Sequence, residues 1–177
     1  MKKLIISLSL VLSVGLLFAA CSNNNESADN QNAADLSGEP SDILNSLIEA
    51  CDVEMVNTMD VAVSPDNAQY YLGLSSEQFT QYVESAAVKE AAINAQAHLV
   101  AVIKCADADS AAELKTLIAT NFDPLRWICV TPEQCFVVDA DNYLLLAATY
   151  ADVATALQTA FADAAGSNMG AVEVFYP

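Results

Sequence analysis

Catalysis through an activated nucleophile would need a base, and the 177-residue chain has a single histidine, His98. Both Ser-His-Asp and Cys-His mechanisms would have to use it. His98 begins the apolar run 98–105 (HLVAVIKC), where a buried histidine with a satisfied hydrogen bond is the commoner role. The chain contains no GxSxG, HExxH, P-loop or GxGxxG motif. We therefore predict no catalytic residue, and a hydrolase with an unrecognised site is the alternative.

Carboxylates gather in three short segments, and each segment could bind a hard cation. The groups are Asp52 with Glu54, Asp107 with Asp109 and Glu113, and Asp139 with Asp141. The second group stands where a helix is expected to begin, and acids there cap free N–H groups; the third stands in a turn. Neither of these two groups has the spacing of an EF-hand loop. We expect no metal and no other cofactor, and a cation-binding or structural surface protein is a second alternative.

Four aromatic residues are weak candidates for a site that binds sugar or peptide. Tyr70 and Tyr71 follow a turn at 64–67, and Trp127 and Tyr150 are expected to lie near one another. Aromatic residues at such spacing more often belong to the core.

The N-terminus has the order of a secretory signal: Lys2 and Lys3, an apolar run at 4–18, then small residues before Cys21. The apolar run is shorter than the roughly 20 residues of a membrane span. With a cysteine at the cleavage point, the FAACS junction resembles a bacterial lipoprotein signal, although Phe18 stands where leucine is usual. The resemblance implies that residues 1–20 are removed and that Cys21 carries acyl chains. Those chains would hold the protein at the outer face of the bacterial cytoplasmic membrane.

The chain is strongly acidic, with a formal net charge of −17. Loss of residues 1–20 removes Lys2 and Lys3, which leaves four basic residues against 23 acidic ones and a net charge of −19. Such a surface repels nucleic acid, so we exclude it as a partner. It also repels anionic headgroups, so the lipid alone should make the membrane contact.

Four cysteines follow Cys21, and two interpretations of them stay open. They are Cys51, Cys105, Cys129 and Cys135. In an exported chain an even number allows disulfides, with three possible connectivities. Each of the four also lies among apolar residues, as a free cysteine that behaves as a small hydrophobe does. If one bridge forms, we expect it between Cys129 and Cys135, because the chain can turn at Thr131–Pro132.

Composition divides the mature chain into two parts. Residues 21–40 are polar after the cysteine, with one large apolar residue, Leu36, and should form a disordered tether. Residues 41–177 suffice for one hydrophobic core and one domain, which we expect to be a monomer.

Apolar periodicity and capping signals predict the elements of that domain. Helices are expected from Ser41 to about Cys51, from Asp109 or Ser110 to before Asp123, and at 151–165. Another helix is expected to begin at Ser75, which forms a capping box with Gln78. Strands are expected at 98–105, 134–139 and 143–149, with a weak edge strand at 170–177. Segment 82–94 is left open between helix and strand. This order predicts an α+β fold, with a mostly antiparallel sheet and helices packed on one face.

Residues 70–165 resemble a family of small lipoprotein domains of unknown function from Gram-positive bacteria. The shared features are an apolar strand that ends in Lys104 and Asp107, a proline before a hairpin at Pro132, and the hairpin turn Asn142–Tyr143. The resemblance implies an anchored extracytoplasmic domain and assigns no site residues. We therefore expect a lipid-anchored extracellular protein whose domain binds or assists an unknown ligand or envelope protein without catalysis.

Overall fold

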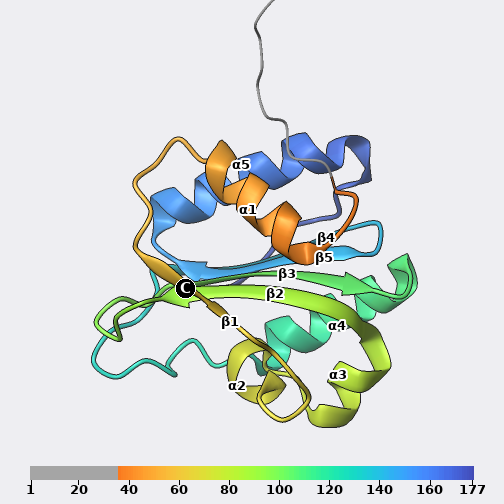
Figure 1. Cartoon of the computed structure of the whole chain (residues 1–177), viewed down its shortest axis with the longest axis horizontal. Helices are drawn as coiled ribbons and strands as arrows, with labels where there is room; N and C mark the ends of the chain where they lie inside the picture. Colours follow the sequence, from red (N-terminus) through yellow and green to blue (C-terminus); the bar gives the residue numbers. More distant parts are fainter. Residues whose placement is uncertain (1–35) are drawn as a thin grey trace, which may run out of the picture. The chain divides into compact units, whose positions relative to one another are not determined.

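A six-stranded sheet organises the part of the chain that the computed structural model describes, residues 36–177 (Figure 1). In sheet order the strands are β1 (Thr58–Val61), β2 (Val83–Ala91), β3 (Leu99–Cys105), β5 (Tyr143–Thr149), β4 (Gln134–Ala140) and β6 (Glu173–Tyr176). The helices are α1 (Pro40–Ala50), α2 (Ala68–Leu72), α3 (Ser76–Tyr82), α4 (Ala108–Asn121) and α5 (Ala151–Ala165), followed by the 3₁₀ turn η1 (Gly166–Asn168). Every neighbouring pair of strands is antiparallel. The predicted α+β class with an antiparallel sheet is confirmed.

Helices cover both faces of this sheet, so the prediction that they pack on one face is wrong. Helices α1 and α5 lie on one face, and α2, α3 and α4 lie on the other (Figure 1). The reason is in the central strands, where both side-chain parities are buried: in β3, Val100 and Val102 pack with α1 and α5, while Leu99 and Ile103 pack with α4. A strand that is apolar on both faces needs cover on both sides.

Most of the segment 82–94, left open between helix and strand, forms the strand β2. The predicted capping box starts α3: the backbone N–H of Gln78 donates to Ser75 Oγ over 3.2 Å, and the N–H of Ser75 donates to Gln78 Oε1 over 2.8 Å. The helix ends at Tyr82, and β2 begins at the next residue with β1 and β3 paired on its two sides. Pairing on both edges outweighs the helical propensity of the alanines in this segment.

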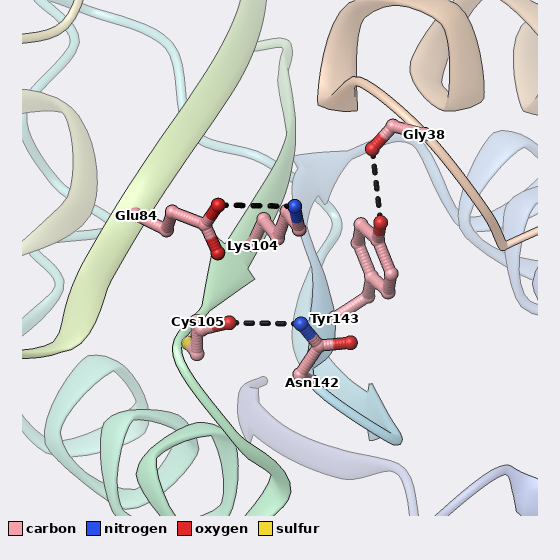
Figure 2. Close-up of polar contacts among 6 residues, drawn as sticks. All are labelled: Gly38, Glu84, Lys104, Cys105, Asn142 and Tyr143. Carbon is pink, nitrogen blue, oxygen red and sulfur yellow. Dashed lines mark hydrogen bonds and ion pairs between the residues drawn. The ribbon is translucent and has the colours of Figure 1, made fainter.

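The composition predicts that the domain begins at residue 41, but in the structure its N-terminal boundary lies earlier. Helix α1 begins at Pro40, whose fixed φ suits a first helical position, and Leu36 packs against the core of α1 and α5. The hydroxyl of Tyr143 donates to the carbonyl oxygen of Gly38 over 2.9 Å (Figure 2). Residues 36–40, assigned above to the tether, therefore contact the folded domain.

Two elements lack a clear sequence signal, and both precede β2. They are the edge strand β1 and the five-residue helix α2, which ends at Gly73 with φ of 73°. Gly73 is required there, because a Cβ would lie 2.5 Å from the backbone nitrogen of Phe122. Helix α4 begins one or two residues earlier than predicted, since Asp107 accepts from the N–H of Ser110 over 2.8 Å as the N-cap.

Candidate functional site

A pocket of about 890 Å³ opens at one end of the sheet. That end is where β2 and β5 finish and β3 and β4 begin, so four separate chain segments meet there. The lining residues are Glu54, Met55, Val56 and Asn57 before β1; Ala92, Ile93 and Gln96 in the β2–β3 turn; Glu133 before β4; and Tyr150, Ala151, Asp152 and Val153 at the start of α5. The segments combine polar groups with apolar side chains, as ligand pockets commonly do.

The pocket is lined by three carboxylates and by no basic side chain. Glu133 accepts from the backbone N–H of Ala151 over 3.0 Å, and Asp152 accepts from the N–H of Val153 over 2.8 Å. Both therefore sit at the N-terminus of α5, where the helix dipole favours negative charge. Glu54, the third carboxylate, is exposed and lies in the segment before β1.

The basic residues of the domain all form ion pairs with acidic residues outside the pocket. Residues 36–177 contain four, and each forms an ion pair outside the pocket: Lys89 with Asp60 at 2.6 Å, Lys104 with Glu84 at 3.1 Å (Figure 2), Lys115 with Asp139 at 2.5 Å, and Arg126 with Glu90. No positive side chain of the domain is left to neutralise the pocket. The carboxylates of the pocket therefore have no basic side chain of residues 36–177 as a counter-charge.

Of the four aromatic candidates, Tyr150 lines the pocket, whereas Tyr70, Tyr71 and Trp127 gather elsewhere around Arg126. The guanidinium carbon lies 4.2 Å from the ring centre of Tyr70, 5.2 Å from that of Tyr71 and 4.6 Å from that of Trp127. The expected proximity of Trp127 to Tyr150 is wrong, because Trp127 packs in the core beneath α4 and Tyr150 packs on the opposite face of the sheet.

This aromatic cage is filled by the chain's own cation. The Arg126 side chain is 3% exposed, pairs with Glu90, and donates from Nη1 to the carbonyl oxygen of Tyr70 over 2.6 Å. Cation–π contacts of this kind stabilise a buried guanidinium. The cage is thus occupied in the folded domain and is not open to a ligand.

His98 has the buried, hydrogen-bonded role that its position in the sequence predicts. Its Nδ1 lies 2.6 Å from the hydroxyl oxygen of Thr149, and the two residues are 1% and 0% exposed. Burial lowers the pKa of His98 to about 4, so the ring is neutral at physiological pH. Neither residue lines the pocket.

The carboxylate groups singled out in the sequence have separate structural partners. Asp107 caps α4, Asp139 binds Lys115, and Asp141 accepts from the side-chain amide of Asn168 over 2.9 Å. Throughout residues 36–177, no three acidic, cysteine or histidine side chains converge at a point where they could hold a metal ion. Glu54 alone among these candidates reaches the pocket.

The four cysteines of the domain are free in this structure, including Cys129 and Cys135, the pair considered above for a bridge. Cys105 and Cys135 are buried, and burial raises the pKa of each thiol to about 12. They pack as small apolar side chains of the core beneath α4. Cys129 is exposed, with a φ of 66°.

The comparisons with known proteins return no match: no protein-family model, no curated protein and no solved structure is similar to the chain. Among the helices of residues 36–177, none has the length and apolar character needed to cross a membrane. Cys21, the predicted signal and most of the predicted tether lie outside the described residues.

Most of the pocket was not foreseen from the sequence. Gln96, Glu133 and Asp152 carried no signal, because they lie in segments up to 56 positions apart that only the sheet brings to one end. Glu54 and Tyr150 were candidates for different chemistries, and the fold places them in the same pocket.

Proposed function

We propose that the protein is a lipid-anchored binding domain of the bacterial cell envelope, and that it holds its ligand in the pocket at the end of the sheet without catalysis. One observation carries the proposal: the pocket of about 890 Å³, which is within the size range of sites for small molecules. The anchored part of the proposal rests on the FAACS junction, with Cys21 as the lipidated residue, and on the resemblance to Gram-positive lipoprotein domains.

The chemistry around the pocket supports binding over catalysis. Its lining has no histidine, lysine, cysteine or serine, and the carboxylates of Glu133 and Asp152 already accept backbone N–H groups at the start of α5. His98 and Thr149 are hydrogen-bonded to one another but buried, out of reach of a substrate in the pocket. The four segments of the lining instead offer carboxylates, amides and apolar side chains, which bind and orient.

A pair of matched substitutions tests whether the pocket is the binding site. Ala92 lines the pocket, and Ala95 is an exposed residue of the same β2–β3 turn outside the lining. Ala92→Trp should fill part of the pocket, and Ala95→Trp should add the same bulk to the surface.

The assay is amide-detected NMR of the isotope-labelled domain with a library of amines, amino acids, short peptides and sugars. We expect binders to shift resonances of the lining residues and to lose affinity in Ala92→Trp but not in Ala95→Trp. A library that leaves the lining resonances unmoved, or binders that tolerate Ala92→Trp, would contradict the proposed function.

A further inference from the structure

The chemistry of the pocket assigns it a ligand class: we propose that it binds a small aliphatic polyamine, a molecule with two or more ammonium groups on a flexible hydrocarbon stem. The inference rests on the proposed function, since it names the ligand of that same pocket. The charge of the carboxylates, their origin in separate segments of the chain and the apolar part of the lining support it.

Charge selects a cation. Glu54, Glu133 and Asp152 line the pocket, and each basic side chain of residues 36–177 is held in an ion pair elsewhere. An anionic ligand would meet three like charges with no counter-charge from the protein. An ammonium group would gain charge-assisted hydrogen bonds to carboxylate oxygens.

The lack of a common centre for the three carboxylates favours several separate ammonium groups over a single metal ion. The three carboxylates come from three segments of the lining, and they are not among any group that converges closely enough to coordinate one ion. Divalent cations take several oxygen ligands at 2.0–2.6 Å from one centre. A flexible chain with ammonium groups at intervals can instead meet each carboxylate in turn. The side-chain amides of Asn57 and Gln96 provide further oxygen acceptors in the same lining.

The apolar side chains fit the hydrocarbon stem of such a molecule. Met55, Val56 and Ile93 line the pocket, and Ile93 is 57% exposed although it is a large apolar residue. A bound methylene chain would cover this apolar surface. Tyr150 adds an aromatic ring, whose face attracts an ammonium group.

Spermidine is the test ligand, titrated into the folded domain and followed by calorimetry and by the amide resonances of the lining. Its triacetylated derivative keeps the stem and removes the charges, and sodium chloride at matched ionic strength accounts for screening. Glu54→Gln and Asp152→Asn each remove one pocket carboxylate while keeping an oxygen acceptor. Asp66→Asn is the matched control, because Asp66 is an exposed acid outside the lining and its loss changes the net charge equally.

We expect spermidine to shift the lining resonances and the acetylated derivative to leave them in place. Each pocket substitution should weaken spermidine binding by up to about fivefold, the upper end of the range for exposed ion pairs, and Asp66→Asn should leave it unchanged. An equal effect of Asp66→Asn, or binding of the acetylated derivative, would overturn the inference. If spermidine leaves the lining unmoved while another library member binds there and is blocked by Ala92→Trp, the polyamine assignment fails and the proposed function stands. If no compound reaches the lining, both fail.

Discussion

The buried imidazole of His98 should make the domain lose stability in mild acid. The ring is 1% exposed, and burial lowers its pKa from 6.5 to about 4 in the folded state. As pH falls, the unfolded chain therefore takes up a proton before the folded domain does, and protonation favours unfolding. The contribution is fully present above about pH 6.5 and is lost progressively as pH falls toward 4.

The size of this loss follows from the two pKa values. Between pH 8 and pH 5, proton linkage through this one group should lower the free energy of unfolding by about 2 kcal/mol. Carboxylates also titrate in acid, so the comparison is with His98→Gln, which keeps a side chain able to hydrogen-bond Thr149. Urea unfolding at both pH values should show a loss about 2 kcal/mol larger in the wild-type domain than in the variant.

A direct measurement is available because the chain has one histidine. The ring C–H resonance of His98 in the folded domain should stay in place from pH 8 to pH 5. A resonance that titrates with a midpoint near the unperturbed value, or equal pH dependence in wild type and His98→Gln, would refute the assignment of a neutral, buried ring.

Three further predictions concern the ion pair, the N-terminal contact and the anchor. Arg126→Met should lower the free energy of unfolding by about 3 kcal/mol, because the partly buried negative charge of Glu90 loses its partner. Adding Glu90→Gln should restore part of that loss in urea unfolding, and no restoration would contradict the explanation. Tyr143→Phe should cost about 1 kcal/mol and speed proteolytic cleavage near Gly38, and unchanged cleavage there would show that the hydroxyl contact does not hold this segment. Cys21→Ala should abolish incorporation of a clickable fatty acid in intact bacteria, and persistent labelling would remove the basis for the anchor.

The sequence predicts most elements of this fold because their signals are local. The Ser75 capping box and the apolar strand 98–105 each contain, within a few residues, the information that fixes them. The strand even carried evidence against helices on one face only, since it is apolar at both parities. Strand β2 could not be predicted in this way, because its alanines become extended only through pairing with β1 and β3. The pocket escapes local patterns for the same reason: Glu54 and Asp152 are 98 positions apart, and the topology of the sheet brings them to one end.

The hydrogen bond between Tyr143 and Gly38 also has a geometrical consequence for an anchored protein. Tyr143 begins β5 and Tyr150 follows its end, so the seven residues of this strand, about 20 Å, separate the point where residues 36–38 join the domain from the pocket. The contact between Tyr143 and Gly38, drawn in Figure 2, and the pocket therefore lie at opposite ends of the sheet. If Cys21 carries a lipid, tension along the chain would enter the domain at residues 36–38, and the far end, with the pocket, would lie away from that attachment point.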